Sequence, residues 1–450
     1  MRRLDPVWHC YPDSLFSIPW RKRRLLFRPL TGWARLVSSQ ESALFIEDHA
    51  VSIDKSSAFT DFGRGDPLPE RSMFRPISLT LLLQSGCHLS CRYCYGRKDA
   101  AYKNAHLDWK AIDNATRFVA RNAFERAKPL TLILHGDCEP LHNFDFVTEA
   151  VDRVRAVSDS YGVGLDIYST TSGVLPKRSL AWALQHLKGV TLSWDGDKAA
   201  HDFNRPKRNG GSSYEDVMRA SDLFHECRIP IRLRSTVTDA SLDTLPAAVR
   251  SLANRLKTRV VFQLEPVFSF PGMADSVVKA PTVNRFVRGF LEILSLLDQT
   301  GCRVEYSGAR LHQNHHRFCS FLQDNLPITV TGKAVGCFLP SRFSETTYAD
   351  FLKCTTVDEE TINSHCKEAL TDFDDCYRCF AREHCSRHCP DICWQTKERP
   401  NRKSRCRQTR KILLGQLLIR CLHELTGDEI DEIVHADVSF GEHQYGVVIK

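Results

Sequence analysis

The chain has 450 residues, of which 61 are lysine or arginine and 54 are acidic, and its formal net charge is +7. Hydrophobic residues make up 42% and charged residues 26%, as is usual for a soluble globular protein. No stretch approaches the roughly 20 apolar residues that cross a bilayer, and the start lacks the apolar core of a signal peptide. We therefore expect a cytoplasmic protein of about two or three domains, without a membrane partner.

Residues 1–75 are basic and irregular, and we treat them as an N-terminal extension. Within them, residues 25–30 and 33–37 are rich in apolar side chains and flank a Thr31-Gly32 turn. Two such runs joined by a short glycine turn indicate a hairpin. The extension is thus a candidate peptide-binding region.

From residue 76 onward, short β-branched runs alternate with longer amphipathic stretches. The expected strands are 77–83, 130–134, 163–168, 190–194, 231–237 and 260–264, and the expected helices are 108–127, 144–158, 178–187, 214–227, 242–255 and 282–298. This alternation predicts an α/β fold, in which a parallel sheet curls into a partial (β/α)6 barrel over residues 76–300. Barrels of this kind carry their chemistry at the carboxyl ends of the strands.

After residue 300 the rhythm stops, and Cys, His, Arg and Pro dominate through residue 406. The chain has 18 cysteines, which in a reducing compartment point to metal or redox chemistry rather than disulfides. We expect residues 301–410 to form a domain held together by metal sites, because they contain few apolar runs. Residues 411–450 form a C-terminal helix and tail, with a helical pattern over 407–425 that ends at Gly427.

Three cysteines, Cys87, Cys91 and Cys94, follow the first expected barrel strand with the spacing C-x3-C-x2-C. Three thiolates on one tight loop can hold three irons of a [4Fe–4S] cluster and leave the fourth iron open for catalysis. The alternative is a zinc site, but zinc usually takes four ligands arranged as paired C-x2-C elements.

These residues resemble the signature of the radical S-adenosylmethionine (radical SAM) superfamily, C-x3-C-x-aromatic-C, with Tyr93 as the aromatic residue. The resemblance implies that S-adenosylmethionine binds the open iron and yields a 5′-deoxyadenosyl radical. The segment from Gly136 to Pro140 is similar to the family's GGEP motif, and Ser193 to Arg205 contains a pattern similar to S-[IL]-D-G…H-D-x-x-R. By resemblance and by their position after strands, the candidate cofactor-binding residues are Tyr93, Glu139, Ser169, Ser193, Arg205 and Arg234.

A second cysteine array resembles the SPASM pattern, C-x(9–15)-G-x4-C, then C-x2-C-x5-C-x3-C, then a final cysteine. The matching residues are Cys319, Gly332, Cys337, Cys376, Cys379, Cys385, Cys389 and Cys406. The resemblance implies one or two auxiliary [4Fe–4S] clusters, the first on Cys319, Cys337 and Cys389 and the second on Cys376, Cys379, Cys385 and Cys406. The fourth ligand of the first cluster stays open between Cys302, Cys354, Cys366, Cys393 and none.

Enzymes with this pattern mostly modify peptides or proteins, so the resemblance implies a peptide maturase that forms an oxidative crosslink. Its partners would be a small precursor peptide and an electron donor such as flavodoxin or ferredoxin, and Glu265 after the sixth strand is a candidate catalytic residue. One alternative is a formylglycine-generating sulfatase maturase, but Phe338 stands where those enzymes carry an aspartate base. The others are an iron–sulfur electron carrier and a zinc-stabilised nucleic-acid-binding protein. The last is disfavoured because the basic residues form no stripe with aromatic ones.

Overall fold

The computed structural model describes residues 16–42, 73–94, 96, 105–136, 138–256, 260–267, 278–298, 300–313, 322–337, 346–370, 379–386, 400–436, 439–440 and 447–448. The strands are β1 (Phe16–Trp20), β2 (Arg23–Arg28), β3 (Trp33–Ser38), β4 (Ser78–Leu82), β5 (Leu130–His135), β6 (Leu165–Thr171), β7 (Gly189–Ser193), β8 (Ile231–Val237), β9 (Val261–Pro266), β10 (Arg303–Glu305), β11 (Asn325–Ile328), β12 (Lys333–Val335), β13 (Thr347–Asp350), β14 (Ser439–Phe440) and β15 (Val447–Val448). The α-helices are α2 (Trp109–Glu125), α3 (Phe144–Ser160), α4 (Lys177–His186), α5 (Lys198–Asn204), α6 (Tyr214–Glu226), α7 (Leu245–Leu256), α8 (Val283–Leu297), α10 (Glu359–Leu370), α12 (Pro400–Leu422) and α13 (Gly427–His435).

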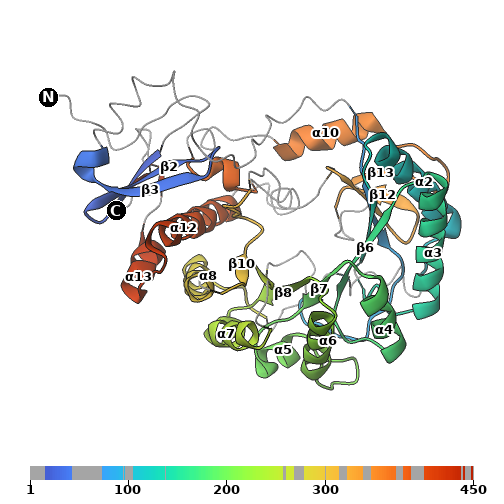
Figure 1. Ribbon diagram of the computed structural model, residues 1–450, viewed down its shortest axis with the longest axis horizontal. Coiled ribbons are helices and arrows are strands. Elements are labelled where there is room, and N and C mark those ends of the chain that lie inside the picture. Colours follow the sequence, from blue (N-terminus) through green and yellow to red (C-terminus); the bar gives the residue numbers. More distant parts are fainter. Residues whose placement is uncertain are drawn as a thin grey trace.

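The central feature is one curved sheet in which β4 to β9 lie side by side in chain order, each parallel to the next. Helices α2 to α8 form an arc around its outer face (Figure 1). The predicted (β/α)6 unit is confirmed, and each expected strand and helix lies within a few residues of its predicted bounds. All six strands run in the same direction, so their carboxyl ends meet at one edge.

Four further strands that the sequence pattern did not predict extend this sheet at both edges. β10 pairs in parallel with β9, and β11 pairs in parallel with β4 and continues into β12 and β13 by antiparallel pairing. Each has only three or four residues, too few to show an alternating pattern. The segment that was expected to form a separate domain therefore shares its backbone hydrogen bonding with the barrel.

Side chains at the helix starts explain where several of the outer helices begin. Asp108, Asn143 and Thr282 precede α2, α3 and α8, and each side chain accepts a hydrogen bond from a backbone N–H of the first turn. Such caps pair backbone donors that would otherwise lack a partner. In the described residues, no helix is both long enough and apolar enough to span a bilayer.

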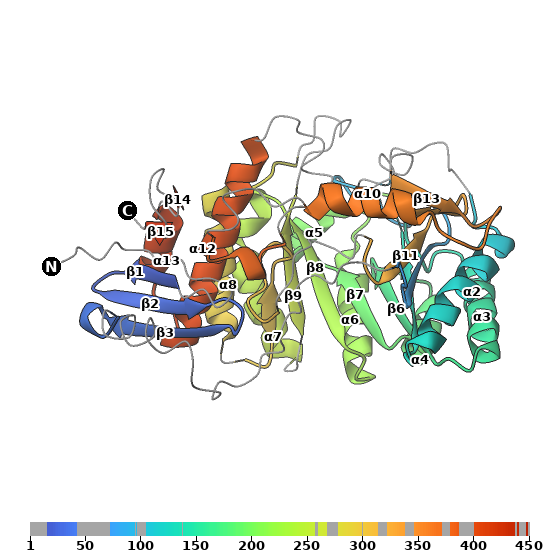
Figure 2. The ribbon, with the colours of Figure 1, turned by 90° about the horizontal axis from the view of Figure 1, so that it is seen from above.

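The N-terminal strands β1, β2 and β3 form an antiparallel sheet. The predicted hairpin is confirmed as β2 and β3, joined through Thr31 and Gly32, whereas β1 was missed. Figure 2 shows α12 lying between this sheet and α8. The predicted helix end at Gly427 is wrong: α12 stops at Leu422, and Gly427 instead begins α13, whose capping box is formed by Thr426 and Glu429.

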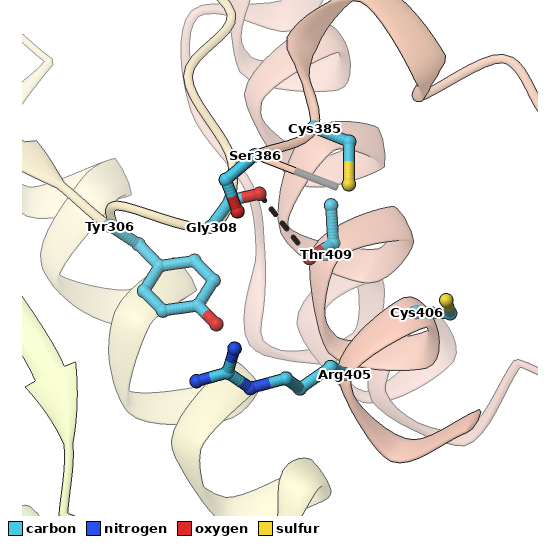
Figure 3. Close-up of a pocket in the computed structure, with 7 residues that line it drawn as sticks. All are labelled: Tyr306, Gly308, Cys385, Ser386, Arg405, Cys406 and Thr409. Carbon is cyan, nitrogen blue, oxygen red and sulfur yellow. Dashed lines mark hydrogen bonds between the residues drawn. The ribbon is translucent and has the colours of Figure 1, made fainter. Parts of the chain in front are cut away.

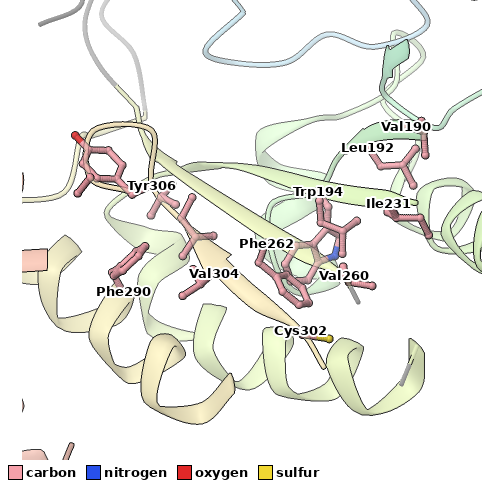
Figure 4. Close-up of a cluster of buried hydrophobic side chains, with 14 of the residues drawn as sticks. Val190, Leu192, Trp194, Ile231, Val260, Phe262, Phe290, Cys302, Val304 and Tyr306 are labelled. Atoms are coloured by element: carbon pink, nitrogen blue, oxygen red, sulfur yellow. The ribbon is translucent and has the colours of Figure 1, made fainter. Parts of the chain in front are cut away.

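The apolar core lies between the sheet and the outer helices. Figure 4 shows part of it, where Trp194, which follows β7, packs against Phe262 of β9, and Phe290 of α8 faces Val304 of β10. Cys302 belongs to this core at the start of β10, and Tyr306 follows the other end of the same strand. β10 therefore connects the apolar core at Cys302 with the edge of the barrel at Tyr306.

Gly332, the glycine of the SPASM-like element, lies in the turn between β11 and β12. Its φ is +76°, and a Cβ atom built there would lie 2.8 Å from Cγ of Leu352 and 3.2 Å from Cβ of Ala111. A side chain would thus be strained by the left-handed backbone and would also overlap packed neighbours.

We expect Gly332→Ala to lower the free energy of unfolding by about 2–6 kcal/mol, because the strained backbone and the overlap each contribute roughly 1–3 kcal/mol. Gly162→Ala is the matched control, since Gly162 has a φ of +66° but open space around it. That variant should lose about 1 kcal/mol. Urea denaturation of the two variants measures the difference, and equal losses would contradict the overlap.

Candidate functional site

The loop that carries Cys87, Cys91 and Cys94 leaves the carboxyl end of β4 and is fixed to the segment that follows α5. The N–H of Ser90 donates to the carbonyl of Pro206 at 2.8 Å, and the N–H of Arg92 donates to that of Asn204 at 2.9 Å. The backbone at the end of α5 therefore holds the cysteine loop at the carboxyl ends of the barrel strands.

The three thiols lie in one small apolar cluster. Cys91 is 9% exposed, Cys87 and Cys94 are half-buried, and Leu89 and Tyr93 pack with them. Burial and the charge of Glu139 raise the pKa of the Cys87 thiol to about 12. Burial raises the pKa of the Cys91 thiol to about 11. A bound metal would therefore have to displace protons from these thiols.

The three thiols agree in number and spacing with the ligand set of an iron–sulfur cluster that leaves one iron open. Among the described residues, no three Cys, His, Asp or Glu side chains converge on one point as a mononuclear metal requires. An iron–sulfur cluster makes a different demand, because each thiolate binds a separate iron. Three thiols spaced along one loop, with a backbone N–H of Leu89 directed at Cys87 Sγ at 3.4 Å, meet that demand.

A buried polar network lies directly beneath the loop. The Tyr93 hydroxyl donates to Oδ2 of Asp195, and Arg205 Nε lies 3.1 Å from the same oxygen. The Arg205 guanidinium also lies over the Tyr93 ring, 5.2 Å from its centroid. Burial would lower the pKa of Arg205, but the charge and hydrogen bond of Asp195, together with Tyr93 and Cys91, outweigh burial and raise it.

This network gives a structural role to Arg205, which was predicted to bind the cofactor. In the structure Arg205 pairs with Asp195 and anchors Tyr93, the predicted aromatic of the signature. Asp195 and His201 were inside the recognised motif, yet their role was missed because only the tertiary fold brings them to the loop. The N–H of Asp195 donates to Nδ1 of His201 at 3.2 Å, and burial lowers the pKa of His201 to about 4.

Glu139 lies at the exit of β5 and is 1% exposed. Its carboxylate accepts hydrogen bonds from the Thr171 hydroxyl at 2.7 Å and from the Ser172 hydroxyl and N–H at 2.6 and 2.8 Å. Burial raises its pKa, and these hydrogen bonds oppose that rise. The predicted cofactor acid therefore also joins the ends of β5 and β6.

The other predicted residues are spread along neighbouring strands of the barrel. Ser193 of β7 and Arg234 of β8 are paired in register, and Ser169 of β6 donates to the Leu134 carbonyl at 3.3 Å. On β8, the residues that alternate with Arg234 are buried against the helices, so Arg234 faces the concave side. His135 lies close to it, and burial together with the Arg234 charge lowers the pKa of His135 to about 4.

Glu265, the candidate catalytic residue, is at the carboxyl end of β9 and is 6% exposed. Its Oε1 accepts hydrogen bonds from Gln263 Nε2 at 2.9 Å and from the Ser307 N–H at 3.1 Å. Its Oε2 is buried and has no hydrogen-bond partner in the described part of the chain. A buried carboxylate oxygen without a donor is costly, so this atom is suited to receive a proton or a ligand donor.

Of the auxiliary cysteines, Cys337, Cys379, Cys385 and Cys406 are described, whereas Cys319, Cys376 and Cys389 lie outside the described residues, as does Phe338. Cys385 and Cys406 line one small cavity together with Tyr306 and Arg405 (Figure 3). Their common position agrees with one shared ligand set, which stays a prediction.

The open candidates for a fourth ligand differ in their surroundings. Cys302 lies in the apolar core at the start of β10, at the end of that strand opposite to Tyr306 (Figure 4). Cys366 is buried on α10, Cys354 is half-buried after β13, and Cys393 lies outside the described residues. The position of Cys302 argues against it as a ligand.

Comparison with known proteins gives the following matches. Residues 81–242 match the family model of the radical SAM superfamily. A serine-type anaerobic sulfatase-maturating enzyme from Klebsiella aerogenes is 26% identical over 171 residues, which are 37% of this chain and 40% of that enzyme. The solved structure of native anSMEcpe with bound AdoMet and Cp18Cys peptide has a TM-score of 0.58 and 16% identity, covering 76% of this chain and 98% of that one. Streptococcus suis SuiB bound to precursor peptide SuiA has a TM-score of 0.52 and 13% identity, covering 86% and 96%.

These matches identify the fold and one segment of sequence similarity. The chain spans about two fifths of the length of the Klebsiella enzyme that it matches, and the family-model match lies in the barrel. At 13–16% identity the two solved structures show a common fold, which extends beyond the barrel into the cysteine-rich region. The predicted fold class is thereby confirmed.

We expect Arg205→Gln to lower the free energy of unfolding by about 3–5 kcal/mol, because it leaves the buried Asp195 charge without its partner. The matched control is Arg255→Gln, which breaks an exposed pair with Asp222 and should cost less than about 1 kcal/mol. Anaerobic urea denaturation measures both changes, and a similar small loss in both variants would contradict the anchoring role.

The depressed pKa of His201 predicts a pH dependence of stability. Its pKa is about 4 in the folded chain and roughly 6.5 when unfolded, so the unfolded state binds more protons between these values. Stability is therefore lost as the pH falls through this window, by about 2 kcal/mol between pH 7 and pH 5. His201→Gln should lose correspondingly less than the parent over the same range. Identical slopes in the two proteins would refute a neutral, buried His201.

Proposed function

We propose that the chain, whose residues 81–242 match the radical SAM family model, is a radical SAM enzyme acting on a peptide or protein. One observation carries the proposal: three cysteine thiols with the superfamily spacing occupy an anchored loop at the mouth of a parallel barrel. When bound there, a [4Fe–4S] cluster with S-adenosylmethionine supplies a 5′-deoxyadenosyl radical that abstracts hydrogen from the substrate.

The chain's own residues would bind and orient these groups. Cys87, Cys91 and Cys94 would hold three irons, and the buried Tyr93 keeps the loop in place beneath them. Arg234 would bind the carboxylate of S-adenosylmethionine, since a guanidinium fits two oxygens at once and the rival Arg205 is paired with Asp195. Ser193, next to Arg234 in register, would contact the ribose.

Glu265 would serve as the proton acceptor of the reaction. The carboxylate is held in place through Oε1 by Gln263 and the Ser307 backbone, while Oε2 has no donor among the described residues. Oε2 is therefore available to a substrate, and it lies at the carboxyl end of a strand, where barrels carry their chemistry. Glu265 would thus take the part of the aspartate base that sulfatase maturases carry where this chain has Phe338.

A peptide substrate is supported by what the neighbours with this fold bind. The anSMEcpe structure contains a Cp18Cys peptide and the SuiB structure contains the precursor peptide SuiA. We propose that this chain acts on a small precursor peptide and forms an oxidative crosslink, with flavodoxin or ferredoxin as the electron donor. Cys337, Cys379, Cys385 and Cys406, with the remaining SPASM-like cysteines, would hold one or two auxiliary clusters.

Formylglycine formation is the second candidate, favoured by the match to the Klebsiella sulfatase-maturating enzyme. The two reactions differ in the product: formylglycine carries an aldehyde that reacts with hydrazide reagents, whereas a crosslink does not. An iron–sulfur electron carrier without catalysis is the third candidate, and it would form no deoxyadenosine.

We expect the anaerobically reconstituted chain to form 5′-deoxyadenosine from S-adenosylmethionine and dithionite. The triple variant Cys87→Ala, Cys91→Ala, Cys94→Ala should form at least about a hundredfold less, because the residual binding residues cannot replace the cofactor chemistry. Chromatography of the quenched reaction measures the product. Cys227→Ala is the control, since Cys227 is exposed and distant in sequence from both cysteine groups. A cluster-loaded parent that forms no deoxyadenosine would refute the enzyme and favour the electron carrier.

A further inference from the structure

The outer flank of the cysteine loop pairs with the segment that follows α5. Leu89 and Lys207 form an antiparallel bridge, and the N–H of Arg208 donates to the His88 carbonyl at 3.0 Å. The N–H of Arg92 adds the bond to the end of α5 that is described above. The two segments therefore run side by side, and the side chains on their outer surface border the thiol-bearing loop.

Burial alternates along the loop from residue 89 to residue 93. Leu89, Cys91 and Tyr93 are buried, and the Tyr93 hydroxyl reaches Asp195, which follows β7. Arg92 lies between two of these buried residues and is exposed. Cys91 therefore faces the interior of the protein, whereas Arg92 lies on the adjoining outer surface.

Three exposed side chains occupy this outer surface, and we call them the loop patch: Arg92, Phe203 and Arg208. Phe203 is 42% exposed. The Arg92 guanidinium lies over the Phe203 ring, 4.4 Å from its centroid, and Arg92 Nε donates to the Phe203 carbonyl at 2.6 Å. This stack presents a cation and an aromatic ring to solvent in one fixed arrangement.

The loop patch carries a positive charge that no acidic side chain balances. The neighbouring Lys207 pairs with Asp216 at 2.5 Å, so that lysine and carboxylate neutralise one another. Arg92 and Arg208, in contrast, make no ion pair within the part of the chain that the structure describes. Arginine and aromatic side chains are the residue types that most often anchor protein interfaces, so the composition of the patch indicates a docking surface.

We propose that the loop patch is the docking surface for the reducing partner, a small acidic electron-transfer protein. This inference rests on the proposed function, because it assumes that an electron enters the chain at the cysteine loop. Electron transfer weakens steeply with distance, so the donor has to dock on the surface that borders the thiols. Electron-transfer complexes bury little area, and a few anchoring side chains therefore dominate the contact.

The transfer at this surface involves one electron. The donor protein is oxidised by that electron, and the sulfonium of S-adenosylmethionine gains it as its C–S bond breaks into methionine and the adenosyl radical. A peptide substrate, in contrast, has to reach the concave side of the barrel, where Arg234 faces. The loop patch lies outside the loop, and its unpaired charge steers an acidic partner toward it.

The test measures binding of a flavodoxin to the full-length chain by anaerobic isothermal titration calorimetry. Replacement of both arginines, Arg92→Gln with Arg208→Gln, should weaken binding about tenfold at low salt, since electrostatic steering raises association rates by about 10- to 1000-fold. Raising the ionic strength from about 0.01 M to about 0.15 M should weaken binding by the parent much more than binding by this variant. Equal affinities of parent and variant would overturn the proposal.

Two matched double variants separate position from net charge. Arg92→Lys with Arg208→Lys keeps both charges and should bind nearly as tightly as the parent. Arg117→Gln with Arg121→Gln removes two exposed arginines from α2, which occupies a different part of the arc of helices from α5 (Figure 1), and should leave binding unchanged. Similar losses for the two glutamine pairs would refute a specific patch.

Phe203→Ala tests the aromatic part of the patch without removing a charge. It should weaken binding roughly fivefold, as truncation of an interface anchor commonly does, and full affinity would contradict its role. Poly-L-glutamate is the second probe, because it is acidic but carries no electron. Binding as tight as that of flavodoxin, with the same dependence on both arginines, would overturn the assignment to a donor protein.

Failure of this inference and failure of the proposed function give different results. The ratio of flavodoxin-driven to dithionite-driven 5′-deoxyadenosine formation should fall about tenfold in Arg92→Gln with Arg208→Gln. Deoxyadenosine formation with an unchanged ratio would overturn the docking surface alone. Flavodoxin binding that depends on both arginines, in a chain that forms no deoxyadenosine even with dithionite, would support the docking surface and refute the enzyme.

Discussion

The position of the cysteine loop depends on one buried interaction, the pairing of Asp195 with Tyr93 and Arg205. A short loop that carries three thiols has little apolar surface with which to fix itself. A carboxylate withdrawn from water needs hydrogen-bond donors and a counter-charge, so the loop, the end of β7 and the end of α5 keep one relative arrangement. The strand ends of the barrel are rigid, and this network fixes the thiol-bearing loop to them.

A second constraint joins the barrel to the cysteine-rich region. β10 starts in the apolar core and ends at Tyr306, whose ring packs on α8 while the next residue donates its N–H to Glu265. His384 adds a further link, since its Nε2 lies 2.8 Å from the Pro29 carbonyl and its Nδ1 lies 3.2 Å from that of Gln313. The predicted proton acceptor and the Cys385–Cys406 cavity therefore lie on opposite sides of one loop.

Periodic patterns made the barrel predictable from the sequence, because each of its strands and helices is long enough to show alternation or a 3.6-residue stripe. The short strands β10 to β13 have too few residues to show either. The cysteines were found from their spacing, which is a local property of the sequence. The role of Asp195 was not, because its partner Tyr93 lies 102 residues earlier in the chain. Arg205 was predicted to bind the cofactor, and the structure adds its pairing with Asp195.

Helix α12 packs on α8 and on the N-terminal sheet, and it also carries Cys406. The predicted auxiliary ligands are thus contributed by segments far apart in the chain, and the last of them arrives only when this C-terminal helix docks. The loop after β4, in contrast, has all three thiols within one short segment. The proposed auxiliary sites would therefore depend on the docking of α12, whereas the loop after β4 would not, and the iron stoichiometry of a preparation would report how much of it has completed this packing step.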